Sequence, residues 1–188
     1  MRVNKPSLIE EIEKHLRQCW TDRRLFEIWS EYNTALEIQK RHPEWILTVR
    51  TRSCDVLCEY NVTRIKVEVK TGKWQTPTWD ELVMKSADAV FSNYQIKNKD
   101  AFDFVVFYIH EDYKKVREIL VFNREDLKEV RERRGNRASS YFISRVESIE
   151  DLEKWMNKYV PPEPVFNLEK QLVDNPEQFR DKWEKIKF

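Results

Sequence analysis

The spacing of hydrophobic and polar residues changes along this chain and separates predicted strands from predicted helices. In RIKVEVK, from Arg64 to Lys70, apolar and charged residues alternate, and a period of two is typical of a strand with one buried face. The turn residue Asn61 separates this stretch from the preceding DVLCEY, which indicates an antiparallel hairpin. With WILTVRT just before them, the strands expected in this region cover residues 45–51, 55–60 and 63–71.

Three further strands are expected later in the chain. FDFVVFYIH is almost entirely apolar, as is typical of a central strand that is buried on both faces. VREILVFN predicts a second strand, and SYFISRVES predicts a strand at the edge of the sheet. These strands cover residues 102–110, 116–123 and 140–148.

Apolar residues three and four positions apart predict helices around these strands. The first helix follows the capping residue Ser7, and another has Pro77 in its first turn. Gly135 and Asn136 end a third. The expected helices cover residues 8–20, 22–41, 77–95, 124–134, 148–160 and 167–188, the last one bent near Pro176.

This order of elements predicts an α/β fold in which a mixed β-sheet is flanked by helices. The segment from residue 22 to residue 110 has the order αβββαβ, and the expected core covers about residues 22–123. Prolines at positions 161, 162 and 164 indicate a linker. We therefore expect one main domain over residues 1–160 and a C-terminal helical arm over residues 161–188.

Acidic and basic side chains gather where the third strand ends. A hairpin centred on Asn61 and Val62 sets position 55 opposite about position 68, so Asp55 is expected near Glu68. Lys70 lies on the same strand face as Glu68, because side chains on one face repeat every two residues. Carboxylates of this kind suit Mg²⁺ or Mn²⁺, and the carbonyl of Val69 would be available as a further ligand.

The stretch CDV…IKVEVKTGK resembles the core of the PD-(D/E)XK nuclease superfamily, which includes restriction endonucleases and archaeal Holliday-junction resolvases. The resemblance extends from about Leu25 to Asn123 and implies a restriction-endonuclease-like fold. Cys54 stands where the superfamily's name has its proline. Carried over by position, the resemblance makes Asp55 and Glu68 metal ligands and Lys70 the catalytic lysine.

Many nucleases of this superfamily add an acidic residue from the helix that precedes the first strand. Glu31 and Glu27 are the candidates here, and both lie on one face of the predicted helix. Glu31 has the spacing that we expect for a metal ligand and catalytic residue, and Glu27 is the alternative. The alternative for both glutamates is a surface position in contact with solvent and without a role in the site.

The composition supports a folded domain but does not point to a partner. Hydrophobic residues make up 40% of the 188 residues, with seven tryptophans, and charged residues make up 36% with a net charge of +1. The segment Lys114–Arg137 has nine Lys or Arg against five Asp or Glu, whereas Glu147–Phe188 has seven against ten. This uneven distribution suits a phosphate-facing surface and suits two salt-bridged helical faces equally well.

Several classes of site and location are disfavoured. The three cysteines lack zinc-type spacing, which favours free thiols in a reducing cytoplasm. No apolar run approaches membrane-spanning length, and the N-terminus lacks the apolar core of a signal peptide. With only two glycines, a glycine-rich phosphate loop is excluded.

Some residues outside the acidic cluster are candidates for nucleic-acid contacts. Lys73, Trp74 and Gln75 directly follow the third strand, although Trp74 would equally suit a loop that covers the sheet. The remaining candidates are Lys85, Arg133, Arg134 and Arg137, and solvated positions are the alternative for them. We assign no functional role to Gln95, because the Gln-x-x-x-Tyr motif of RecB-like nucleases is absent.

The sequence therefore predicts a Mg²⁺-dependent DNA endonuclease, with Mn²⁺ as a substitute, and favours a restriction-type enzyme. The alternatives are a structure-selective nuclease such as a Holliday-junction resolvase, and a non-catalytic nucleic-acid-binding module of the same fold. Cutting both strands usually requires two active sites, so we expect a homodimer. We expect no membrane partner.

Overall fold

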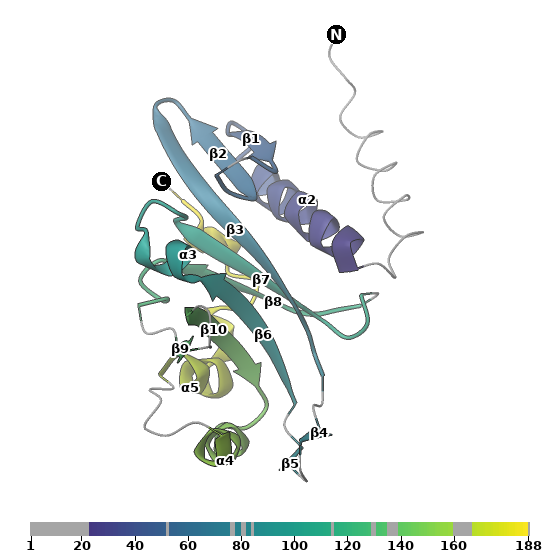
Figure 1. Cartoon of the computed structure of the whole chain (residues 1–188). Helices are drawn as coiled ribbons and strands as arrows, with labels where there is room; N and C mark the ends of the chain where they lie inside the picture. Colours follow the sequence, from purple (N-terminus) through teal and green to yellow (C-terminus); the bar gives the residue numbers. More distant parts are fainter. Residues whose placement is uncertain are drawn as a thin grey trace.

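The computed structural model describes residues 23–51, 53–75, 78–79, 82–83, 85–113, 115–128, 131–134, 139–159 and 167–187. Its centre is a mixed five-stranded sheet with the order β1-β2-β3-β7-β8 (Figure 1). The strands are β1 (Ile46–Val49), β2 (Val56–Tyr60), β3 (Thr63–Lys73), β7 (Phe104–His110) and β8 (Val116–Asn123). All five were predicted, and the sheet with its flanking helices confirms the predicted fold class.

The hairpin of β2 and β3 has the register that the sequence indicated. Val56 pairs with Val67 and Tyr60 with Thr63, so the chain reverses at Asn61 and Val62. Asn61 has a φ of 54°, which asparagine tolerates better than most residues. On the other side, β3 runs parallel to β7, with Glu68 opposite Val105 and Lys70 opposite Phe107. The long strand β3 therefore lies at the centre of the sheet.

The helix predicted over residues 77–95 is wrong. This segment forms the short strands β4 (Thr78–Trp79) and β5 (Leu82–Val83), the longer strand β6 (Ser86–Ser92) and a short helix, α3 (Asn93–Lys97). Along β6 the buried residues Ala87, Ala89 and Phe91 alternate with exposed ones, which is the period of a strand. Pairing with β10 then outweighs local helix propensity.

A second sheet has the order β6-β10-β9, with β9 covering Arg131–Arg134 and β10 covering Ser139–Val146. The predicted strand at 140–148 is thus present, but it is the central strand of this sheet and not an edge strand. The helix predicted over residues 124–134 is wrong, because a turn and β9 occupy the described part of it. Asn123 and Asp126 close that turn by reciprocal side-chain-to-backbone hydrogen bonds of 2.9 Å.

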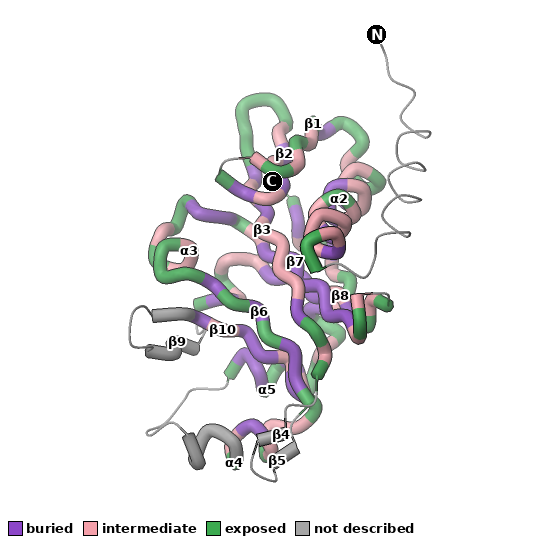
Figure 2. The backbone as a smooth tube through the Cα atoms, turned by 45° about the vertical axis from the view of Figure 1, so that its right-hand side comes forward, coloured by how far each residue is buried: buried purple, intermediate pink, exposed green. Residues whose placement is uncertain are grey.

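Helix α2 (Arg23–Arg41) packs on the five-stranded sheet and confirms the helix predicted over residues 22–41 (Figures 1 and 2). Phe26 and Ile38 bury its apolar side, and Thr34 shares a 3.1 Å hydrogen bond with the buried hydroxyl of Tyr108 on β7. This bond fixes the helix against the strand, so the residues of α2 that face β3 have defined positions.

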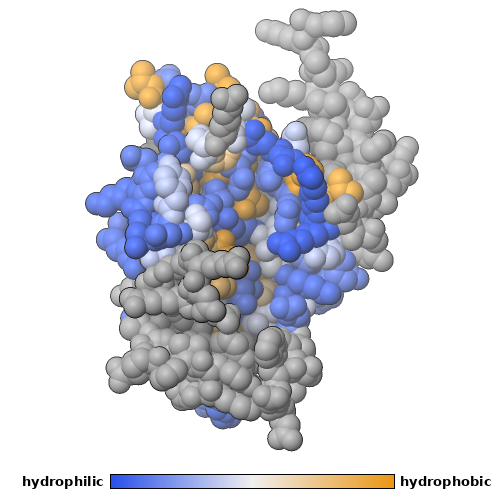
Figure 3. Space-filling model, in the orientation of Figure 1, coloured by the Kyte–Doolittle hydropathy of each residue, from blue (hydrophilic) through white to orange (hydrophobic). Residues whose placement is uncertain are grey.

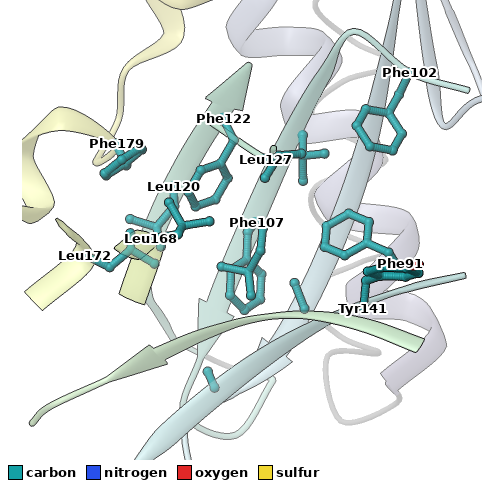
Figure 4. Close-up of a cluster of buried hydrophobic side chains, with 14 of the residues drawn as sticks. Phe91, Phe102, Phe107, Leu120, Phe122, Leu127, Tyr141, Leu168, Leu172 and Phe179 are labelled. Atoms are coloured by element: carbon teal, nitrogen blue, oxygen red, sulfur yellow. The ribbon is translucent and has the colours of Figure 1, made fainter. Parts of the chain in front are cut away.

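The C-terminal part of the chain packs against the sheets through α4 (Ile149–Tyr159), α5 (Asn167–Asp174) and two 3₁₀ turns, η1 (Pro176–Gln178) and η2 (Trp183–Lys185). Leu168, Leu172 and Phe179 join the same hydrophobic cluster as Leu120 and Phe122 (Figure 4). The predicted boundary at residue 160 lies outside the described residues, as does the helix expected over residues 8–20. Both stay predictions.

The edge of β8 is covered by the residues that follow η1. The backbone N–H of Val121 donates to the carbonyl of Phe179 at 2.8 Å, and that of Asp181 donates to Ile119 at 3.0 Å. The carboxylate of Glu118 is buried and binds Arg145 of β10 and Arg180 of this segment, at 2.9 and 2.6 Å. The ion cluster ties the two sheets to the C-terminal segment. Within the described residues, no helix is long and apolar enough to cross a lipid bilayer.

Candidate active site

A polar pocket of about 350 Å³ lies between α2, the end of the β2–β3 hairpin and β6. It brings together the residues that the sequence singled out at the end of β3. Its lining consists of Arg23, Glu27, Glu31, Asp55, Glu68, Val69, Lys70, Thr71, Asp88 and Val90. Hydrophilic residues are the most common in the coloured part of the face shown in Figure 3, and apolar side chains are scattered among them.

Asp55 reaches this pocket from the turn between β1 and β2. Continuing the register of β2 and β3 by one residue sets Asp55 opposite Glu68, as predicted. The Oδ2 atom of Asp55 accepts a 2.7 Å hydrogen bond from the backbone N–H of Val69. The turn is closed by the N–H of Arg50, which donates to the Asp55 carbonyl at 2.6 Å. Both bonds hold the carboxylate beside β3 and leave its Oδ1 atom for a ligand.

Glu68 and Lys70 point into the pocket from the same face of β3. The ammonium of Lys70 donates to Oε1 of Glu68 at 2.7 Å, and the two side chains are only 17% and 12% exposed. An exposed ion pair on a strand face, the structural alternative for these residues, would be far more open to water. Strand β3 thus presents a carboxylate and an ammonium as a fixed pair.

Gln95 is a site residue that the sequence analysis missed. Its Nε2 atom donates to Oε1 of Glu68 at 2.5 Å. Its Oε1 atom accepts from the backbone N–H of Ser92, while Ser92 Oγ accepts from the N–H of Gln95, and this capping box starts α3. The Ser-x-x-Gln pattern was available in the sequence, but the helix expected over residues 77–95 concealed it. Asp88 was missed for the same reason, because it enters the pocket on β6.

Helix α2 contributes both acidic candidates, in different environments. Glu27 forms an ion pair with Arg23 one turn earlier, and its side chain is 40% exposed. The side chain of Glu31 is only 12% exposed, and its Oε2 atom lies 3.2 Å from Nε of Arg50. That buried oxygen makes no hydrogen bond of normal geometry with any group. Burial and proximity to Asp55 favour Glu31 over Glu27 as the helix acid, and its role stays a prediction.

The carboxylates of this pocket are partly buried and lie near one another. Burial, followed by the charge of Asp55, raises the pKa of Glu31 to about 7, although Arg50 opposes this effect. Burial and the charge of Glu68 raise the pKa of Asp55 to about 6, against the N–H of Val69 and the ammonium of Lys70. Raised pKa values on neighbouring, partly buried acids are typical of functional sites.

The residues present fit a hard divalent cation. The buried, unsatisfied oxygen of Glu31 and the remaining oxygens of Asp55 and Glu68 supply the hard donors that Mg²⁺ and Mn²⁺ prefer. Over the described residues, no three His, Cys, Asp or Glu side chains form a complete metal-binding group. Mg²⁺ does not require one, because it is usually held by one or two carboxylates together with waters and substrate phosphates.

The predicted nucleic-acid contacts have mixed placements. Lys73 and Gln75 are exposed at and beyond the end of β3, whereas Trp74 packs against the core with the guanidinium of Arg117 4.5 Å from its ring centre. Trp74 thus covers the sheet, which is the alternative that the sequence analysis gave for it. Lys85 precedes β6 and is not helical, and it pairs with Glu147 at 3.5 Å.

Two of the other three basic candidates lie on β9. Arg133 and Arg134 belong to this strand and pair with Ser140 and Ser139 of β10. Arg137 lies outside the described residues. The contacts of all three with nucleic acid stay predictions.

Three residues outside the pocket are buried in the fold. His110 is buried, and its Nδ1 atom accepts from the backbone N–H of Tyr113 at 3.0 Å. Burial, together with the charge of Lys73, lowers its pKa to about 4, so it stays neutral. Cys54 and Cys58 are buried free thiols, as the absence of zinc-type spacing indicated.

Comparison with known proteins gives the chain no family. No protein family matches its sequence, and no curated protein matches it either. Among solved structures, the chain is similar to the bacterial homing endonuclease I-Ssp6803I, with 17% sequence identity and a TM-score of 0.45. This match covers 88% of the present chain and 91% of that one. A likeness this distant does not establish function, which must be argued from the site itself.

Proposed function

We propose that this chain is a metal-dependent DNA endonuclease of the PD-(D/E)XK type and that the polar pocket is its active site. The observation that carries the proposal is the convergence of Asp55, Glu68 and Lys70 in one pocket, with Glu31 facing them from α2. Three separate elements supply these groups. Burial raises the pKa of both Asp55 and Glu31, and a neighbouring carboxylate adds to each effect, that of Glu68 for Asp55 and that of Asp55 for Glu31. This is the arrangement expected of a cation-binding hydrolytic site.

Each residue has a distinct task in this proposal. Asp55 and Glu68 hold the cation, with Glu31 and the carbonyl of Val69 as further ligands. A bound Mg²⁺ or Mn²⁺ supplies charge for the scissile phosphate and makes water more acidic. Lys70 lies 2.7 Å from Glu68, which positions its ammonium to orient the attacking water or to stabilise charge that develops on the phosphate.

Within this activity we favour a restriction-type enzyme that acts as a homodimer. The segment after β8, residues 124–188, exceeds what a minimal junction resolvase needs, and it would offer surface for base recognition or dimerisation. A second copy would supply the second active site that a double-strand cut needs.

Cleavage assays test this function directly. Supercoiled plasmid and a synthetic four-way junction are incubated with the protein in Mg²⁺, in Mn²⁺ and in EDTA. We expect metal-dependent cutting that Glu68→Gln and Lys70→Met abolish. Glu59→Gln is the matched control, because Glu59 lies on the same hairpin but binds only Arg64 near the turn.

The pattern of products separates the proposed enzyme from its alternatives. Discrete plasmid fragments support the restriction type, and selective junction cutting points to a resolvase. If the folded wild-type protein cuts neither substrate with either metal, or cuts equally well after Glu68→Gln, the proposed function is wrong.

A further inference from the structure

Arg50 has an unusual backbone at the edge of the pocket. Its φ of 60° lies in the left-handed region, which residues other than glycine rarely adopt. The neighbouring hydrogen bonds impose this conformation. The N–H of Arg50 donates to Asp55 at 2.6 Å, and the N–H of Thr51 donates to Cys54 at 3.1 Å. The same turn that places Asp55 therefore also directs Arg50, and a strained residue at a functional site calls for an explanation.

The side chain of Arg50 binds Glu31 in an incomplete way. One guanidinium nitrogen, Nε, lies 3.2 Å from Oε2 of Glu31, but the contact lacks hydrogen-bond geometry. The carboxylate is 12% exposed, whereas the arginine side chain is 46% exposed. A fully formed arginine–carboxylate pair would make two parallel bonds. Arg50 thus supplies positive charge to the buried carboxylate of Glu31, but no well-formed ion pair holds the guanidinium in place.

The other two cations of the pocket are engaged differently. Lys70 makes a 2.7 Å hydrogen bond to Glu68 and is largely buried. Arg23 binds Glu27 within one turn of α2, and its side chain is 75% exposed. Arg50 is the cation that joins two separate elements at the pocket edge, between the buried acids and the solvent. If Glu31 binds a divalent cation, the arginine loses its counter-charge and its guanidinium becomes available.

We propose that Arg50 has two alternating partners, which are Glu31 in the metal-free protein and a phosphate group of the nucleic acid in the metal-loaded protein. This inference rests on the proposed function and adds a phosphate-binding residue to it. The planar guanidinium fork matches phosphate oxygens, and half of the side chain already faces solvent. Before metal binds, the positive charge of Arg50 partly neutralises the buried acids. After metal binds, the same charge is available to a phosphate of the substrate.

The two roles predict effects of opposite sign for Arg50→Ala. Without the competing arginine, Mn²⁺ binding measured by calorimetry in the absence of DNA should become tighter, by about fivefold or more. Cleavage of a fixed duplex at saturating Mn²⁺ should fall in kcat/KM by about a hundredfold, because a phosphate contact is lost. A purely structural role would weaken metal binding and cleavage together.

Arg50→Lys separates the two roles. Lysine keeps the positive charge beside Glu31, so Mn²⁺ affinity should stay within about twofold of the wild type. It cannot form the two-pronged phosphate contact, so cleavage should remain reduced by about tenfold. Arg64→Ala is the control, because it removes the same charge from an exposed pair with Glu59 at the hairpin.

The outcomes distinguish this inference from the proposed function. If the wild-type protein neither binds Mn²⁺ nor cleaves DNA, the proposed function fails and the inference fails with it. If the wild-type protein does both but Arg50→Ala binds Mn²⁺ no more tightly, only the inference is overturned. Thermal melting in EDTA identifies a variant that has lost its fold. If Arg50→Ala has lost its fold, Arg50→Lys decides. Mn²⁺ affinity near that of the wild type with reduced cleavage supports the inference, and equal losses of affinity and cleavage contradict it.

Discussion

Replacing Asp55 with asparagine should stabilise the metal-free protein at alkaline pH. Asparagine keeps the shape of the side chain and an oxygen that accepts the N–H of Val69. It removes a negative charge that burial and Glu68 make costly, and these two causes raise the pKa of Asp55 from 3.8 to about 6. Because the pKa of Asp55 is higher in the folded than in the unfolded protein, protonation of Asp55 stabilises the fold. This contribution is fully present below about pH 4 and is lost as the pH rises through about 6.

The size of the effect follows from that pKa. A difference of one pKa unit corresponds to about 1.4 kcal/mol, which gives an upper bound of about 3 kcal/mol for Asp55. The pocket is open to water, and solvent screening reduces this to about 1–2 kcal/mol. For a chain of this length, the melting temperature should rise by about 2–6 °C at pH 8 and change little at pH 4.

Thermal and urea unfolding in EDTA at these two pH values measure the effect. Asp103→Asn is the matched control, because Asp103 also accepts a backbone N–H, that of Lys66 at 2.8 Å, but is exposed outside the pocket. Adding Mn²⁺ should stabilise the wild type at pH 8 and leave Asp55→Asn nearly unaffected. An Asp55→Asn variant that is less stable than the wild type at pH 8 in EDTA would refute the reasoning.

Two further substitutions probe the supports of the pocket. Gln95→Met removes the donor to Glu68 at constant length and should weaken Mn²⁺ binding by about 10–100-fold in calorimetry. Ser92→Ala also breaks the capping box but leaves that donor in place, so equal losses in both variants would assign the effect to α3 alone. Gly72→Ala would place a methyl group 2.8 Å from the ring of Phe107 and should lower the free energy of unfolding by about 1–3 kcal/mol in urea titrations. An unchanged urea midpoint would show that the ring of Phe107 on β7 does not approach Gly72 this closely.

The sequence predicted the placement of the polar residues at the strand end better than the elements around it. Alternation in β3 and the turn at Asn61 define the hairpin register, and that register alone brings Asp55 to Glu68. Lys70 follows from the two-residue period. These relations are local, so neighbouring residues were enough to predict them.

The segment between β3 and β7 depended on contacts that are distant in sequence. Ala87, Val90 and Phe91 fit a helical spacing, whereas Ala87, Ala89 and Phe91 fit a strand, and short apolar patterns do not distinguish the two. The pairing of β6 with β10, more than forty residues later, decides for the strand. Asp88 lines the pocket and Gln95 reaches Glu68 only because of this pairing, so their positions could not be derived from local pattern.

The most direct test of the central claim is an anomalous difference map from crystals of the protein grown or soaked in Mn²⁺. We predict a peak in the pocket in contact with carboxylate oxygens of Asp55 and Glu68, and no peak there in crystals of Asp55→Asn. A well-ordered pocket with no peak at saturating Mn²⁺, or with Mn²⁺ bound only elsewhere, would contradict the assignment of this pocket as a metal-dependent active site.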